Sequence, residues 1–172
     1  MSIPVRALSP RDAAAFQALR LRGLAEAPAA FASSVEEEQP VPIEHVARRL
    51  EARDDGAIFG SYVDEQLCGL IGIQRESMRK LSHKAILWGM YVAPEARNAG
   101  HGSALVQQAL EHAWSRLSVR QVNLGVHSLN DGAVKLYRRH GFEVFGTELG
   151  ALLVDGQFQD ELHMVCRAKA VA

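Results

Sequence analysis

The sequence contains only two cysteines, Cys68 and Cys166, which lie far apart and lack the spacing of metal ligands. Such a small number predicts neither a disulfide framework nor a metal site, and two reduced thiols are typical of a cytoplasmic protein. No apolar run approaches the roughly 20 residues that a membrane-spanning helix needs, so no membrane partner is expected. Residues 1–6 lack a basic segment leading into an apolar core, and no signal peptide is expected.

The sequence also lacks an excess of charge of either sign. Its 19 Lys and Arg residues nearly balance 20 Asp and Glu residues, which leaves a formal net charge of −1. This balance gives no general electrostatic reason to expect nucleic acid as a partner. The sequence shows no internal repeat, low-complexity tract or linker. We therefore expect residues 1–172 to form one domain, long enough for a substantial core.

The most informative stretch runs from Ile86 to Leu117. Residues 86–92 have the apolar, β-branched and aromatic content of a buried strand, which Pro94 ends because proline cannot donate to a strand ladder. After Gly102 the apolar residues change to helical spacing. The stretch thus predicts a strand, a glycine-containing loop and a helix. The positions with helical spacing are Leu105, Val106, Ala109, Leu110, Ala113 and Leu117.

A loop of this kind can leave several backbone N–H groups free at a helix N-terminus. These donors and the positive end of the helix dipole favour an anion. Gly100 and Gly102 let the backbone approach that anion without an intervening Cβ, and Arg97 can add charge-assisted contacts to a phosphate. The glycines could equally form only a turn. Two other phosphate loops fit poorly, because the dinucleotide fingerprint needs a further glycine where Leu105 stands and the nucleotide P-loop needs a lysine before Ser103.

A second notable stretch covers residues 127–142. Asn130 and Asp131 suit a helix N-terminus, which alone would explain them. Tyr137 lies seven residues after Asn130, two turns along the same helix face. Its simplest interpretation is a buried aromatic side chain whose hydroxyl has found a partner. Gly141 closes the predicted helix.

Together these stretches resemble a known family. The pattern Arg97-x-x-Gly100-x-Gly102 is similar to the pyrophosphate-binding motif of the GNAT superfamily of N-acetyltransferases. Residues 130–142 read Asn-x-x-Ala-x-x-Leu-Tyr-x-x-x-Gly-Phe, which resembles the second cofactor motif of that family. The resemblance is firmest from Leu87 to Phe142 and covers nearly the whole chain.

The order of the expected elements agrees with this resemblance. Strands are predicted at residues 3–8, 57–63, 67–73, 85–92, 119–126, 142–145 and 157–167. Helices are predicted from about residue 10 to 24, briefly after Ser34, at 43–50, from Gly102 to Leu117 and from Asn130 to His140. This is a mixed α/β domain. The resemblance implies the GNAT acyl-CoA N-acyltransferase fold, a central mostly antiparallel sheet flanked by helices.

The resemblance also implies roles for individual residues. The backbone of Arg97, Asn98, Ala99, Gly100, His101, Gly102 and Ser103 would hold the pyrophosphate of acetyl-CoA. The edge of Met90, Tyr91 and Val92 would pair with the pantetheine amides and polarise the thioester carbonyl. Asn130, followed by Ala133 in the motif, would contact the pantetheine arm. Tyr137 would donate a proton to the departing thiolate.

The amine acceptor is less defined. Direct attack needs a neutral amine and hence a general base, usually acting through water. The acceptor could be a small metabolite, a peptide N-terminus or a lysine. Phe31, Ser33, Glu37, His127 and Asp160 are the expected acceptor contacts. The candidate bases or charged recognition groups are Glu26, Glu36, Glu37, His127, Glu148, Asp160 and Glu161.

The sequence thus predicts a cytoplasmic acetyl-CoA-dependent N-acetyltransferase. The alternative is a domain of the same fold that senses acyl-CoA without turnover. The resemblance also allows a homodimer through the last strands.

Overall fold

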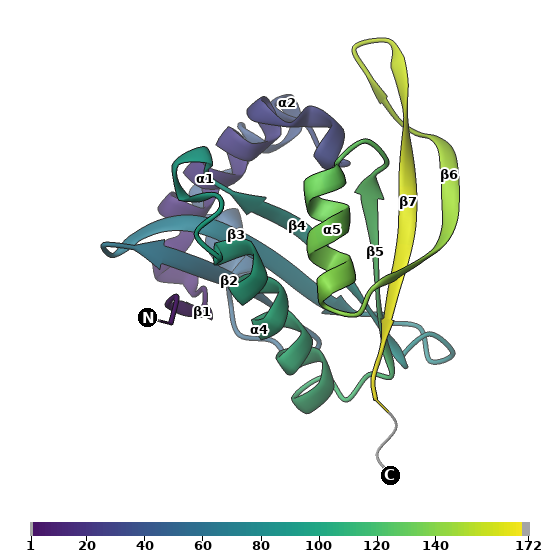
Figure 1. The fold of residues 1–172 in the computed structure, drawn as a ribbon. Helices are drawn as coiled ribbons and strands as arrows, with labels where there is room; N and C mark the ends of the chain where they lie inside the picture. The colour runs from purple at the N-terminus through teal and green to yellow at the C-terminus, as the bar shows by residue number, and fades with distance from the viewer. Residues whose placement is uncertain (1, 170–172) are drawn as a thin grey trace.

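The computed structural model of the chain describes residues 2–169, and within them one mixed sheet lies between two layers of helices (Figure 1). The seven strands in this part of the chain follow the order β1-β2-β3-β4-β5-β7-β6. Each neighbouring pair is antiparallel except β4 and β5, which run parallel. This arrangement confirms the predicted α/β fold with a mostly antiparallel sheet.

The elements appear in the predicted order. The strands are β1 (Val5–Ala7), β2 (Gly56–Val63), β3 (Gln66–Arg75), β4 (Lys84–Val92), β5 (Gln121–His127), β6 (Glu143–Val154) and β7 (Gln157–Arg167). The α-helices are α1 (Ala13–Glu26), α2 (Val35–Glu38), α3 (Ile43–Arg49), α4 (His101–Ser115) and α5 (Asp131–Arg139), with 3-10 turns η1 (Pro10–Asp12), η2 (Pro28–Ala30) and η3 (Pro94–Ala96). Within residues 2–169, no helix has the length and apolar character needed to cross a membrane.

The two helical layers bury different faces of the sheet. The apolar residues of α4 predicted from their spacing pack, together with α5, against the face that carries Ile71, Leu87 and Val122. On the other face, α1 and α3 pack against Ile58 and Leu70. Because α4 and α5 share one layer, the motifs at their N-termini lie on the same side of the sheet (Figure 1).

Strand β6 is much longer than predicted. The sequence indicated a strand at residues 142–145, whereas β6 extends from Glu143 to Val154 and forms a long hairpin with β7. Most of its side chains are exposed. With no buried face, the strand shows no clean alternation of apolar and polar residues, and periodicity could not reveal its length.

The sheet opens between β4 and β5. These strands pair only over Lys84–Ile86 and Gln121–Asn123. Beyond this point they separate, and Figure 1 shows α5 in front of the opening. The backbone groups that face each other along the remaining parts of β4 and β5 are therefore not paired with each other, and they are suited to bind a ligand extended like a strand.

A bulge lies in β4 beside this opening. Gly72 pairs with Trp88 and Leu70 with Tyr91, so three steps along β4 match two steps along β3. The extra residue falls at Gly89 and Met90, and Gly89 has a φ of +64°. A bulge bends its strand and leaves one backbone group outside the ladder. It occurs at the Met90 position that sequence analysis had assigned to the thioester.

Candidate active site

The loop before α4 presents a group of free backbone donors. Asn98 (φ +61°) and Gly100 (φ +95°) adopt left-handed conformations, and α4 has no side-chain N-cap. The first bond into the helix runs from the Ala104 N–H to the Gly100 carbonyl at 3.0 Å. Within residues 2–169, the N–H groups of residues 98–103 have no hydrogen-bond acceptor. This loop, which we call the phosphate cradle, is therefore suited to bind an anion.

Gly102 lies where α4 approaches both β4 and α5. A Cβ at this position would stand 3.1 Å from the Met90 Cε and 3.1 Å from the Leu136 Cδ2. Glycine therefore allows the two side chains to pack over the first turn of α4 without displacing it. This packing places the phosphate cradle next to the opening between β4 and β5.

The side chain of Arg97 does not extend over the phosphate cradle in this structure. Its Nε donates to the Val92 carbonyl at 2.9 Å, and its Nη2 forms an ion pair with Glu26. The Tyr91 hydroxyl also donates to Glu26, at 2.6 Å. The bond from Tyr91, followed by the Arg97 contact, lowers the pKa of Glu26, whereas burial raises the pKa of Tyr91 to about 12. Glu26 is thus a stable carboxylate, which makes it a poor general base.

Tyr137 lies on α5 with only 6% of its surface exposed. Its ring packs edge to face against Phe142, with centroids 5.6 Å apart. Among the described residues, its hydroxyl has no hydrogen-bond partner. The hydroxyl oxygen nevertheless keeps some accessible surface, so a ligand can reach it. Burial raises the pKa of this phenol, so it keeps its proton at neutral pH. The hydroxyl is therefore a proton donor with no protein acceptor.

Asn130 begins α5, as its sequence position predicted. Its side-chain oxygen accepts a 3.1 Å hydrogen bond from the Ala133 N–H. This is ordinary N-capping, and it fixes the side-chain carbonyl while leaving the amide NH₂ group free to donate to a ligand. Asn130 and Ala133 therefore both lie at the N-terminal end of α5.

The segment after α1 packs around a buried cation that the sequence analysis did not single out. Arg20 on α1 is 8% exposed and lies 4.8 Å from the Phe31 ring centroid. Its Nη2 donates to the Ser33 hydroxyl at 2.9 Å and to the Glu38 carboxylate at 2.9 Å. Phe31 thus belongs to the core of this layer, and the half-buried Ser33 hydroxyl is bonded to Arg20 and Glu38.

The other expected acceptor contacts also have local partners. Glu37 forms a capping box with Ser34, as the spacing indicated. His127 Nε2 lies 2.9 Å from the Gln159 Oε1, and the Asp160 carboxylate accepts from the Gly150 N–H at 2.8 Å. Of these residues, His127 lies on the strand face where further polar groups gather.

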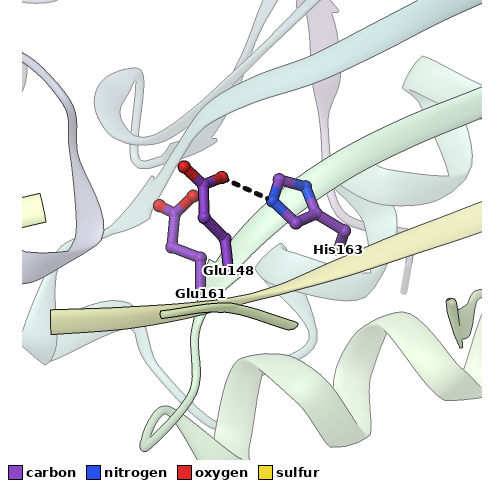
Figure 2. Close-up of side chains that lie close together, drawn as sticks. All are labelled: Glu148, Glu161 and His163. Atoms are coloured by element: carbon purple, nitrogen blue, oxygen red, sulfur yellow. Dashed lines mark hydrogen bonds and ion pairs between the residues drawn. The ribbon is translucent and has the colours of Figure 1, made fainter. Parts of the chain in front are cut away.

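Those polar groups are Glu148, Glu161 and His163, which come from β6 and β7 and point to the same side (Figure 2). Glu148 and Glu161 are directly opposite each other in the strand register, and His163 Nε2 lies 2.8 Å from the Glu148 Oε2. The ligand atoms of the three residues lie within 4.8 Å of one another. We call this group the acidic cluster. Both glutamates were expected from the sequence, whereas His163 was not.

The acidic cluster faces away from α4 and α5. The alternate residues of β7, Leu162 and Met164, belong to the core under those helices. Glu161 extends over Gly125 of β5, where a Cβ would stand only 2.7 Å from the Glu161 Oε2. Strand pairing thus places the cluster next to β5, which borders the opening of the sheet. The cluster lies near η2, which contacts both β5 and β6.

The chain matches known proteins over most of its length. The model of the acetyltransferase (GNAT) family matches residues 22–142. The L-amino acid N-acetyltransferase of Escherichia coli (strain K12) is 29% identical over 126 residues, which cover 73% of this chain and 77% of that protein. The spermidine N(1)-acetyltransferase of Vibrio cholerae is 26% identical over 102 residues, which cover 59% of each protein and hence less than two thirds of the relative.

A solved structure shares the fold. A Salmonella typhimurium protein, determined with its cofactor acetyl-CoA, superposes with a TM-score of 0.86 at 18% identity. The match covers 100% of this chain and 97% of the other. At this level of identity, the similarity shows a common architecture.

Proposed function

The chain belongs to the acetyltransferase (GNAT) family and is an acetyl-CoA-dependent N-acetyltransferase, and we propose that it acetylates a primary amine by direct attack at the opening between β4 and β5. The observation that carries this proposal is the alignment of the phosphate cradle, the open strand edge of β4 and the unpartnered Tyr137 hydroxyl on one side of the sheet.

The phosphate cradle would bind the pyrophosphate of acetyl-CoA. Six free N–H groups at the start of a 15-residue helix supply fixed donors and a favourable dipole. Arg97 needs no role beyond holding the loop, because its guanidinium already bridges Val92 and Glu26. The free edge of β4 from Met90 to Val92 would then pair with the pantetheine amides, and the Asn130 amide would contact the same arm.

The bulge in β4 and Tyr137 would act on the thioester. The Met90 backbone N–H, next to the extra residue of the bulge, would donate to the thioester oxygen and stabilise the negative charge that develops there. Attack by the amine nitrogen forms the new C–N bond, and the C–S bond then breaks. Tyr137 would protonate the departing thiolate, while the proton of the amine leaves through water. Both cysteines are buried, and burial raises the pKa of each thiol, so an acyl-cysteine intermediate has no support.

The acidic cluster would recognise the acceptor. A primary amine arrives mostly protonated, and two opposed carboxylates create a negative potential that attracts it. Glu161 lies on β7, one strand closer to the opening than Glu148 on β6, and is therefore better placed to receive a proton through water. This supports a cationic amine as the acceptor class. The similarity to a spermidine N(1)-acetyltransferase and to an L-amino acid N-acetyltransferase keeps polyamines and amino acids among the compounds to test.

The test of the function is acetyl-CoA binding by calorimetry, followed by release of free thiol with a panel of amines. The panel should contain diamines and polyamines, free amino acids, and peptides with a free N-terminus or a lysine. Amine-dependent thiol release is the expected result. Tight binding of acetyl-CoA without turnover on any class of amine would favour a sensor. Absence of binding would mean that residues 98–103 form only a turn and bind no phosphate.

We also propose a cytoplasmic location for the protein. Both cysteines are buried and unpaired, which supports the location expected from the sequence.

The β6–β7 hairpin exposes Phe145, Leu149, Leu153 and Phe158, each with more than half of its surface accessible. Exposed apolar residues of this size are typical of interaction surfaces. They support a homodimer through the last strands, which sedimentation of the wild type and of Leu149→Glu would test.

A further inference from the structure

Ser103 and His140 join two helices beside the phosphate cradle. Ser103 is the third residue of α4, and its backbone N–H is one of the free donors. His140 caps the C-terminal end of α5. The Ser103 Oγ and the His140 Nε2 lie 2.8 Å apart, so the imidazole stands directly behind the hydroxyl.

The two helix ends near His140 have opposite effects on the charge of its imidazole. The C-terminal end of α5 favours a positive imidazole, whereas the N-terminal end of α4 disfavours it. Burial, and to a smaller extent Arg139, lower the pKa of His140. From β7, the Cys166 thiol donates to the backbone carbonyl of His140 at 3.6 Å. Among the described residues that contact His140, no carboxylate offsets these effects, so an anion that arrives nearby has a large influence.

We propose that Ser103 and His140 form part of the cofactor site, in which the Ser103 hydroxyl binds a phosphate oxygen of CoA and the His140 imidazole behind it supplies positive charge. This inference rests on the proposed placement of the pyrophosphate in the phosphate cradle. His140 is a positioning residue, because it acts through Ser103. Its cation would make CoA binding depend on pH in the range in which histidine titrates.

The direction of this dependence follows from linkage. A bound phosphate favours the charged imidazole and raises the pKa of His140 above its value in the free protein. Binding therefore takes up a proton, and CoA affinity is highest below the free-state pKa. The additional affinity is lost as the pH rises through the bound-state pKa. A change of one pKa unit between the two states corresponds to about tenfold in affinity.

The experiment measures CoA binding by calorimetry from pH 5.5 to 8.5 in the wild type, His140→Gln, Ser103→Ala and His45→Gln. Glutamine keeps a donor for Ser103 but does not titrate. His45 is an exposed histidine on α3, in the other helical layer, and serves as the matched control. Because the phosphomonoester group of CoA itself titrates near pH 6, the quantity to compare is the difference between proteins. We expect the wild type and His45→Gln to gain about tenfold more affinity on acidification than His140→Gln, and Ser103→Ala to lose part of this gain.

A second measurement needs no variant that could fail to fold. The ring C–H resonances of His140, followed by NMR against pH, should titrate at a higher pH in the presence of saturating CoA than in its absence. An unchanged His140 titration, or binding curves that coincide for the wild type and His140→Gln, would overturn the inference. Failure of the wild type to bind CoA at any pH would instead overturn the phosphate cradle itself and, with it, the basis of this pair.

Discussion

Arg20 and Glu38 form an ion pair whose side chains are only 10% and 14% exposed. The Arg20 Nε and Nη2 donate to the carboxylate at 2.9–3.2 Å, and the Ser33 hydroxyl donates to the same carboxylate at 2.5 Å. The pair ties the end of α2 to the middle of α1. It therefore sets the position of the segment between them, which borders β5 and β6 through η2.

Replacing Glu38 with Gln should destabilise the protein strongly. The change leaves the buried Arg20 cation without its counter-charge, and breaking a buried pair on one side costs about 3 kcal/mol. Urea unfolding at pH 7 measures this loss of free energy. The Arg20→Met, Glu38→Leu double variant removes both charges and should stay within about 1 kcal/mol of the wild type.

The same pair predicts a pH dependence. Although burial alone would raise the pKa of Glu38, its bonds to Arg20 and Ser33 lower it. A carboxyl group with a lowered pKa stabilises the fold above its unfolded-state pKa of about 4.3, and that contribution is lost as the pH falls toward the folded value. The stability difference between the wild type and Glu38→Gln should therefore shrink below about pH 4. A difference that stays constant to pH 3 would contradict this.

Tyr137→Phe should slow acetyl transfer without weakening cofactor binding. The substitution keeps the ring that packs on Phe142 and removes only the hydroxyl. General acid catalysis contributes at least about 100-fold, so we expect kcat to fall by about this factor and CoA affinity to stay unchanged. Because the pKa of Tyr137 is raised, the wild-type rate should show no alkaline loss from this group up to about pH 9. An unchanged kcat would remove Tyr137 from the acid role.

Gly100→Ala should weaken CoA binding. Gly100 has a φ of +95°, and a Cβ there would also stand 3.0 Å from the Ile3 Cδ1. Since this strain disturbs the phosphate cradle, we expect about a tenfold loss of affinity by calorimetry. Gly132→Ala is the control, because it lies in the first turn of α5 with its nearest neighbour at 3.9 Å. Equal losses in the two variants would argue against the phosphate cradle.

Glu161→Gln should raise the KM for a cationic amine at least several-fold and leave CoA affinity unaltered. The carboxylate is half-buried and faces Glu148 across the hairpin, so its charge acts at short range. Glu111→Gln makes the same change of charge on the exposed side of α4 and should leave both constants unchanged. If both variants raise the KM equally, the effect is one of net charge, and the acidic cluster has no special role.

The sequence predicted local features well where periodicity or caps expressed them. The spacing of Leu105 to Ala113 marked the buried face of α4, and Asn130 caps α5 as expected. The helix α4 starts slightly earlier than the sequence indicated, because His101 and Gly102 already belong to its first turn. Pairing between distant strands was not readable. The register that brings Glu148 beside His163, and the contact of Ser103 with His140, depend on tertiary packing that no local pattern encodes. Arg97 shows the same limit, because its motif position gave no sign that Glu26 would bind its side chain.

The pairing between β4 and β5 covers only three residues of each strand, which makes this seam a weak line in the middle of the sheet. A substrate that pairs along the free edge of β4 completes the sheet and closes that line. The folded state thereby gains RT ln(1 + [L]/Kd), about 2.7 kcal/mol when acetyl-CoA is present at 100 times its Kd. The heat tolerance and the protease resistance of this enzyme should therefore follow the acetyl-CoA supply of the cell, and starvation for acetyl-CoA should shorten the lifetime of the protein itself.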